Sequence, residues 1–127
     1  MRWILWIDDQ PSRANQVTFP PDVMVIFAHG FEQVKYYLSL SITWELILLD
    51  HDMPLMNGWD VCVHCLIQKS YPVVIVSCNI PASDRMLTLL NEYEVPCTYC
   101  PITDPTSLRD LVYHLLANPG AIKVRKD

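Results

Sequence analysis

The sequence predicts a single-domain α/β protein with a five-stranded, parallel sheet and helices on both faces. Its 127 residues are enough for one domain with a substantial core. Short aliphatic runs typical of buried strands alternate with stretches whose apolar residues recur at helical spacing. This alternation implies parallel strands joined by right-handed crossovers. No repeat or domain boundary interrupts the pattern, so residues 1–120 are expected to form the domain and residues 121–127 a basic, solvated tail.

The predicted central strand covers residues 44–50, where four consecutive aliphatic residues precede Asp50. Such a run suits a strand that is buried on both faces, as in a parallel sheet covered by helices. Pro54 follows shortly afterwards and cannot continue ladder pairing. The other predicted strands are residues 3–7, 23–27, 72–76 and 97–100.

The predicted helices cover residues 31–38, 59–69, about 81–90 and 105–116. Asp104 is suited to cap the last of these helices, with Pro105 at its first position. Between the first two strands, residues 12–16 have room for a turn or so of helix, and the following prolines end anything longer. The first crossover is therefore expected to lack a full helix.

The balance of charge restricts the classes of partner. Nine basic and 14 acidic residues give a formal net charge of −5, which disfavours an extended nucleic-acid or anionic-membrane surface. A small nucleotide bound through a metal remains compatible with this charge. No apolar run could span a bilayer, and the first strand runs directly into Asp8 without a signal-peptide core. We expect a cytoplasmic protein, or at least one made and used inside a cell.

The five cysteines include two C-x-x-C pairs, Cys62/Cys65 and Cys97/Cys100. An odd number argues against a secreted disulfide framework. The two pairs could form a structural zinc site, and a redox motif is a further alternative. The first pair, however, falls on an apolar helical stripe, where buried thiols act as small hydrophobic groups. We therefore expect structural thiols.

Carboxylates follow two of the predicted core strands. Asp8 and Asp9 come after the first strand, and Asp50 and Asp52 flank His51 after the central one. Because ligands of open parallel sheets bind at the carboxyl ends of the strands, these groups predict one shared acidic pocket. Clustered carboxylates must bind a cation or take up protons, and hard oxygen ligands favour Mg²⁺ or Mn²⁺. The alternative is that each Asp merely caps a loop or a helix.

With these residues, the chain resembles the receiver domain of two-component response regulators, the CheY-like superfamily, over nearly its whole length. The resemblance implies a flavodoxin-like, doubly wound three-layer sandwich. It also implies that Asp8, Asp9 and Asp50 hold Mg²⁺, that Asp50 accepts a phosphoryl group, and that the Ser77 hydroxyl bonds that group. Residues 50–58 match the family's local pattern closely.

The chain departs from the receiver pattern in two places. Cys100 precedes Pro101 where the family carries a lysine, so the counter-charge for the phosphoryl group is missing. The full first helix, where partner kinases usually dock, has no room. In both departures the chain resembles a side branch of the family, the predicted cyclic-phosphate-processing receiver domains.

Several spacings carry this finer resemblance: residues 49–52 (Leu-Asp-His-Asp), Ser77-x-Asn79, a later Met86, and Arg13 after the acidic pair. A histidine that often precedes the serine is Val76 here. The resemblance implies Asp50, His51 and Ser77 as catalytic residues, Asp52 as a further metal ligand, and a phosphate contacted by Ser77, Asn79 and Arg13.

The residues leave several roles open. His51 could transfer a proton or bind metal, or it could hydrogen-bond a neighbouring loop. Asn79 could orient a phosphate oxygen or cap a helix, and His29, His64 and His114 have no partner in the pattern. Three functions compete: a metal-dependent enzyme that opens a cyclic phosphate or another phosphoester, a stand-alone receiver phosphorylated on Asp50 in a phosphorelay, and a pseudo-receiver that binds a protein partner through the receiver surface.

Overall fold

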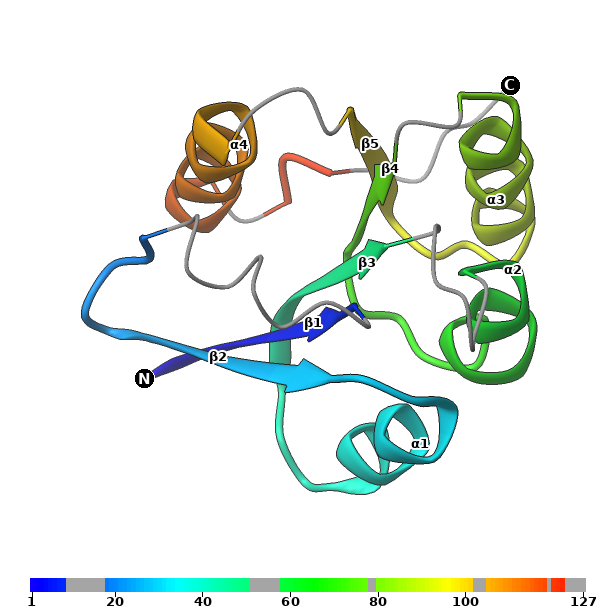
Figure 1. The fold of residues 1–127 in the computed structure, drawn as a ribbon, viewed down its shortest axis with the longest axis horizontal. Helices are drawn as coiled ribbons and strands as arrows, with labels where there is room; N and C mark the ends of the chain where they lie inside the picture. Colours follow the sequence, from blue (N-terminus) through cyan, green and yellow to red (C-terminus); the bar gives the residue numbers. More distant parts are fainter. Residues whose placement is uncertain (9–17, 51–57, 78–79, 102–104, 119, 123–127) are drawn as a thin grey trace.

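The structure is a computed structural model, and it describes residues 1–8, 18–50, 58–77, 80–101, 105–118 and 120–122. Five parallel strands form one sheet in the order β2-β1-β3-β4-β5 (Figure 1). This sheet confirms the predicted fold class. The strands are β1 (Arg2–Ile7), β2 (Val23–Ala28), β3 (Trp44–Asp50), β4 (Val73–Ser77) and β5 (Cys97–Pro101).

The helices lie close to their predicted positions. They are α1 (Phe31–Ser39), α2 (Gly58–Val61), α3 (Ile80–Glu92) and α4 (Pro105–Ala117). The second predicted helix differs from a continuous α-helix, because α2 passes into a π-helical turn, η2 (Cys62–Leu66). A π-turn takes up an additional residue. Here it accompanies the burial of two adjacent side chains, Cys65 and Leu66, against the sheet.

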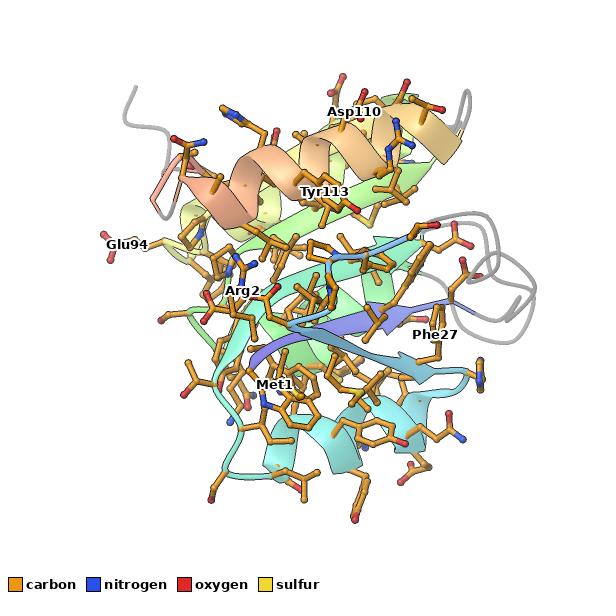
Figure 2. All side chains as sticks on the ribbon, turned by 90° about the vertical axis from the view of Figure 1, so that its left-hand side faces the viewer. Met1, Arg2, Phe27, Glu94, Asp110 and Tyr113 are labelled. Atoms are coloured by element: carbon orange, nitrogen blue, oxygen red, sulfur yellow. The ribbon has the colours of Figure 1, made fainter. Side chains whose placement is uncertain are left out.

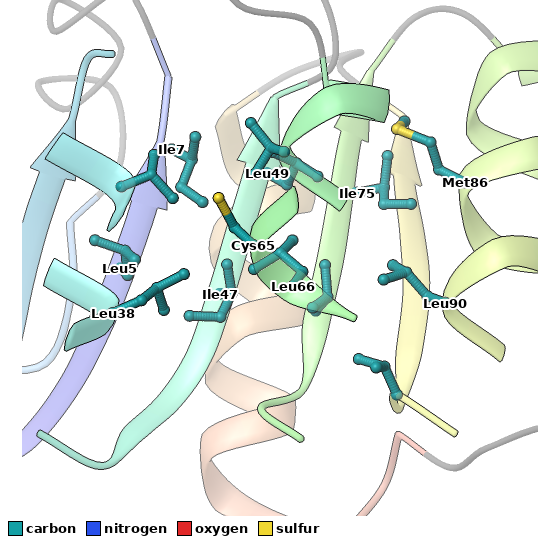
Figure 3. Packing of buried hydrophobic residues seen from close by; sticks show 14 of the residues in the cluster. Leu5, Ile7, Leu38, Ile47, Leu49, Cys65, Leu66, Ile75, Met86 and Leu90 are labelled. Atoms are coloured by element: carbon teal, nitrogen blue, oxygen red, sulfur yellow. The ribbon is translucent and has the colours of Figure 1, made fainter. Parts of the chain in front are cut away.

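One face of the sheet is covered by α1, α2, η2 and α3, while α4 lies on the other face (Figure 1). The core beneath the first group of helices is a cluster of buried hydrophobic side chains. Figure 3 shows part of it, in which Ile7, Leu49 and Ile75 from three strands lie near Cys65 and Met86 from the helices. Burial of aliphatic side chains of this kind is the main stabilising contribution to the fold.

The α4 face has a second core, in which Trp6 and Leu48 from the sheet pack with Leu108 and Val112 of α4. Phe19 and Ile122, from segments at the two ends of the domain, are partly buried against the same cluster. Ile122 extends this packing past residue 120, into the segment predicted as a tail.

A register shift near the start of β3 gives Trp44 its place. Trp3 pairs with Trp44, but the next residue, Ile4, pairs with Leu46, so Glu45 is an extra residue on β3. A bulge of this kind re-aims the side chains beside it. Trp44 therefore packs on the same face as Ile47 and makes an edge-to-face contact with Trp3, at a centroid distance of 6.4 Å.

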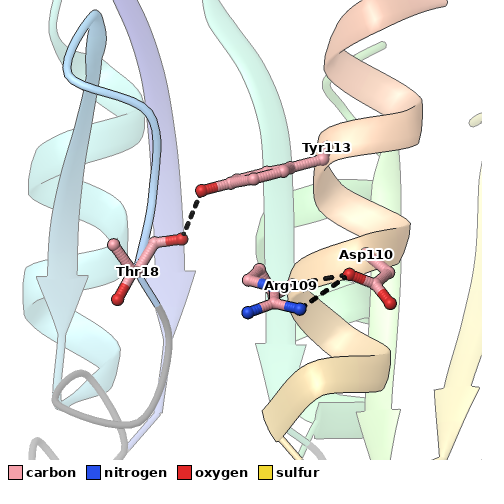
Figure 4. Close-up of polar contacts among 4 residues, drawn as sticks. All are labelled: Thr18, Arg109, Asp110 and Tyr113. Atoms are coloured by element: carbon pink, nitrogen blue, oxygen red, sulfur yellow. Dashed lines mark hydrogen bonds and ion pairs between the residues drawn. The ribbon is translucent and has the colours of Figure 1, made fainter.

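Polar contacts tie the first connection of the chain to its last helix. The Tyr113 hydroxyl of α4 donates to the Thr18 carbonyl at 2.8 Å (Figure 4). The Arg2 guanidinium donates to the Leu116 carbonyl at 3.1 Å and to the Asp22 carboxylate at 2.9 Å. The connection from β1 is thus held at its described end, whereas the turn of helix predicted at residues 12–16 lies outside the described residues.

Candidate functional site

The register of the sheet brings polar residues into one row at its carboxyl edge. Ile7 pairs with Ala28 on one side and with Leu49 on the other, so Asp8 stands next between His29 and Asp50. On the far side, Asp50 pairs with Val76, which pairs with Cys100. We call these five positions, His29, Asp8, Asp50, Val76 and Cys100, the carboxyl row. Its neighbouring strands are about 4.8 Å apart.

The members of this row share the α4 face of the sheet. Phe27 stacks on Trp6 at a centroid distance of 5.0 Å and on the His29 ring at 6.2 Å, which places all three rings on one side. Figure 2 shows Phe27 near the carboxyl end of β2, whereas Arg2 lies toward the opposite end of β1. Because side chains alternate along a strand, Asp8 shares the side of Trp6 and Asp50 shares the side of Leu48. Val76 and Cys100 belong to the same α4-face core.

Asp8 and Asp50 are the buried acidic residues of the described part of the chain, and both have no exposed surface. Two carboxylates that are close together and shielded from water repel each other unless a cation, a proton or hydrogen-bond donors compensate their charge. Carboxylate oxygens on neighbouring strands are the hard donors that Mg²⁺ and Mn²⁺ prefer. The donor chemistry of this pair therefore fits the divalent cation that the sequence implies.

The backbone of Asp8 is held by β2. Its N–H donates to the Ala28 carbonyl at 3.0 Å, and its carbonyl oxygen lies 3.1 Å from Nδ1 of His29. The His29 N–H in turn donates to Oε1 of Gln33 at 2.6 Å. In the sequence pattern, His29 has no partner. The signal that could have found it is its place directly after the second predicted strand, whose carboxyl end lies at the same edge as that of the first.

The structure brings together two of the predicted site residues, Asp8 and Asp50. Ser77 is the last residue of β4 and pairs with Pro101, so its backbone lies at the same edge, one position beyond Val76. The remaining predicted site residues lie outside the described residues: Asp9, Arg13, His51, Asp52 and Asn79. Within the described ranges, no group of three or more His, Cys, Asp or Glu side chains is placed to hold a metal ion.

The cysteine side chains that the structure describes point to different parts of the core. Cys65 packs beneath the helices of one face, whereas Cys100 lies in the α4-face core, so the two thiols are separated by the sheet. Neither these residues nor Cys97 form a disulfide bond. Burial raises the pKa of the Cys65 thiol, because the thiolate would lose its hydration. The cysteine side chains that the structure describes are therefore not gathered into one zinc site.

The fold is that of the receiver domains of response regulators, the CheY-like fold. Comparison with protein-family models and with curated proteins finds no match to the chain. Solved structures do match it, and they include response regulators and their receiver domains. Because these structures are less than 25% identical to the chain, their similarity establishes the fold and not the function.

Three of these structures illustrate the likeness. DrrB, an OmpR/PhoB homologue from Thermotoga maritima, matches with a TM-score of 0.69 and 18% identity, over 100% of this chain and 57% of its own. A CheY-like receiver domain protein from Methanospirillum hungatei matches with a TM-score of 0.67 and 18% identity, over 92% and 94% of the two chains. TrrA from Thermotoga maritima, solved in complex with Mg(2+)-BeF, matches at 0.63 and 19%, over 91% and 99%. The chain thus spans little more than half of DrrB.

Proposed function

We propose that the carboxyl row and the loops that follow it form a site that handles a phosphoryl group with the help of a divalent cation, Mg²⁺ or Mn²⁺. The observation that carries the proposal is the burial of Asp8 and Asp50 side by side on one face of the sheet. Two buried carboxylates on neighbouring strands are costly unless their charges are compensated, and such costs are concentrated at functional sites.

The proposed roles follow the chemistry of each side chain. Asp8, Asp9, Asp50 and Asp52 provide carboxylate oxygens for the cation. A bound divalent cation would neutralise these carboxylates and polarise the phosphoryl oxygens. The site's other polar groups, Ser77, Asn79 and Arg13, donate hydrogen bonds to phosphate oxygens, and this orients the phosphorus for attack.

The first candidate activity is acceptance of a phosphoryl group by Asp50, in a relay with a protein partner. Its support is the receiver fold, together with the position of Asp50 as the last residue of the central strand. In this activity, a carboxylate oxygen of Asp50 attacks phosphorus in line with the leaving group. TrrA, which shares the fold, was solved with Mg(2+)-BeF.

The second candidate is the hydrolysis of a cyclic phosphate or another phosphoester. A water oxygen attacks phosphorus and the bond to the leaving ester oxygen breaks, with Asp50 binding metal and His51 transferring a proton to or from the reacting oxygen. A specific observation favours it: the buried member of the carboxyl row on β5 is Cys100, which lacks the ammonium charge of the lysine found there in receivers. Without that charge, a phosphoryl group retained on Asp50 has less compensation. A chain that only binds a partner is the third outcome.

One comparison of substrates separates these outcomes. Wild type, Asp50→Asn and, as a matched control, the exposed Asp84→Asn are incubated with Mg²⁺ or Mn²⁺ and either acetyl phosphate or a panel of cyclic nucleotides. Gain of one phosphoryl group in the intact mass of wild type and of Asp84→Asn, but not of Asp50→Asn, supports the acceptor activity. Metal-dependent loss of a cyclic nucleotide with the same dependence on Asp50 supports the enzyme. If wild type does neither and binds no divalent ion, the proposal of a phosphoryl site is wrong.

A further inference from the structure

His29 holds the carboxyl end of β1 through a side-chain hydrogen bond. β2 ends at Ala28, whose carbonyl accepts the Asp8 N–H at 3.0 Å. The carbonyl oxygen of Asp8 is bonded by a side chain and not by the backbone of β2: it lies 3.1 Å from Nδ1 of the His29 imidazole. A carbonyl oxygen only accepts, so Nδ1 carries the proton in this pair. Both the neutral Nδ1–H form and the imidazolium can donate this bond, so the contact does not require a change of protonation.

His29 makes two further contacts, one through its ring and one through its backbone N–H. Its ring lies nearly parallel to that of Phe27, at a centroid distance of 6.2 Å and an interplanar angle of 13°. The backbone N–H of the same residue donates to Oε1 of Gln33 in α1. The ring thus contacts Phe27 in β2 and the end of β1, and the backbone N–H of His29 joins the same residue to the first part of α1. A donor held in this way contributes to orientation at little cost in conformational entropy.

This hydrogen bond constrains the backbone of Asp8, one of the two carboxylates of the carboxyl row. Asp8 directly follows the last residue of β1, Ile7, and precedes Asp9, the second member of the acidic pair. With the Asp8 N–H bonded to Ala28 and its carbonyl bonded to His29, the peptide groups on both sides of the Asp8 side chain are held against β2. Loss of supporting hydrogen bonds around carboxylate and histidine ligands typically weakens metal binding 10- to 100-fold, about the range we expect to apply here.

We propose that His29 is a positioning residue of the acidic site, whose Nδ1–H bond to the Asp8 carbonyl holds Asp8 in the orientation that lets it share a divalent cation with Asp50. This inference rests on the function proposed above. It assigns His29 no contact with the cation or with the phosphoryl group.

Two variants separate the hydrogen bond from the ring. His29→Phe keeps an aromatic ring against Phe27 but has no donor, whereas His29→Asn keeps a donor near the place of Nδ1 and has no ring. Mn²⁺ affinity is measured for each full-length protein by calorimetry and by the rise in melting temperature. We expect His29→Phe to bind Mn²⁺ about tenfold more weakly than wild type, and His29→Asn to stay within about threefold of it. His64→Phe is the matched control, because His64 is an exposed histidine that contacts the Phe31 ring on the other face.

The outcomes distinguish this inference from the proposed function. If wild type binds no divalent ion, both are wrong. If wild type binds Mn²⁺ and His29→Phe binds it equally well, or if His29→Asn is weakened as much as His29→Phe, the positioning role alone is wrong. Nitrogen NMR of the wild-type protein shows which imidazole nitrogen of His29 carries the proton. This measurement needs no metal, and it does not depend on whether a variant folds. Protonated Nδ1 at neutral pH supports the proposal, and a proton found only on Nε2 overturns it.

Discussion

Two consecutive rows of the same sheet have opposite characters. The first, which we call the apolar row, consists of Ala28, Ile7, Leu49, Ile75 and Tyr99 and packs beneath α1, η2 and α3. The carboxyl row is one residue further along every strand and faces α4. Since successive side chains of a strand point to opposite faces, a single step along five strands changes a surface of aliphatic side chains and one tyrosine into one that carries two buried carboxylates.

The difference separates what stabilises the fold from what the fold can do. The apolar row removes hydrocarbon from water and makes no demand on ligands. The carboxyl row buries the charges of Asp8 and Asp50, which lowers stability unless something compensates them. Substitutions in the two rows should therefore change the free energy of unfolding by different amounts, with different signs and with a different dependence on metal.

The largest effect is expected in the apolar row. Leu49 is fully buried, so Leu49→Ala removes hydrocarbon and leaves a cavity. The free energy of unfolding should fall by about 3 kcal/mol, equally with and without divalent metal. Urea denaturation measures this change, with the half-buried Leu89→Ala on α3 as a milder control. A loss below about 1 kcal/mol would remove the contrast between the rows.

Divalent metal should act through the carboxyl row alone. A cation that binds only to the folded protein stabilises it by about 2.7 kcal/mol when its concentration is a hundred times the dissociation constant. The melting temperature of wild type should therefore rise with Mn²⁺ and return after chelation. The exposed Asp84→Asn should respond like wild type. If saturating Mn²⁺ changes the melting temperature of neither protein, the carboxyl row is not a metal site and the partner-binding alternative becomes the leading one.

Asp50→Asn should have a smaller effect of opposite sign. The change removes one of two neighbouring buried carboxylates. Without metal, the free energy of unfolding should increase by about 1 kcal/mol because repulsion is relieved. The variant should also gain less than wild type from Mn²⁺, because one ligand is lost. Urea denaturation of wild type and Asp50→Asn, with and without Mn²⁺, tests both expectations. Equal stabilisation of the two proteins by Mn²⁺ would contradict the assignment of Asp50 as a ligand.

The smallest effect is expected far from both rows, at the start of the sheet. The hydrogen bond from Arg2 is the main reason that the pKa of the Asp22 carboxyl lies below its ordinary value of 3.8. A depressed folded-state pKa contributes stability above the pKa of the unfolded chain, and this contribution is lost as the pH falls through the folded value. The loss should occur below about pH 4. Because the pair is exposed, its contribution to the free energy of unfolding should be small. Asp22→Asn removes the ion pair and leaves the Arg2–Leu116 hydrogen bond in place, so melting of this variant above and below about pH 4 measures the contribution, and carbon NMR titration of wild type gives the pKa of the Asp22 carboxyl.

The sequence alone predicted the features that follow from the pattern of apolar and acidic residues. The aliphatic runs predicted the strands, and the carboxyl ends of parallel strands predicted that Asp8 and Asp50 would meet. The π-turn at residues 62–66 and the bulge at Glu45 were not predicted, because both are adjustments of an element to its packing rather than signals of composition. The role of His29 depends on which strand lies beside β1, and the strand order becomes visible only when the sheet is assembled.

The links between Tyr113 and Thr18 and between Arg2 and Leu116 affect the order in which the domain can be completed. On the ribosome, β1 and the segment around Thr18 are made before α4, which supplies both partners and follows all five strands. Until α4 arrives, Trp6 and Leu48 lack the helix that covers them. The nascent chain therefore carries an uncovered hydrophobic surface until α4 is made, and a product that stops before Pro105 would retain it as a site for chaperones or for aggregation.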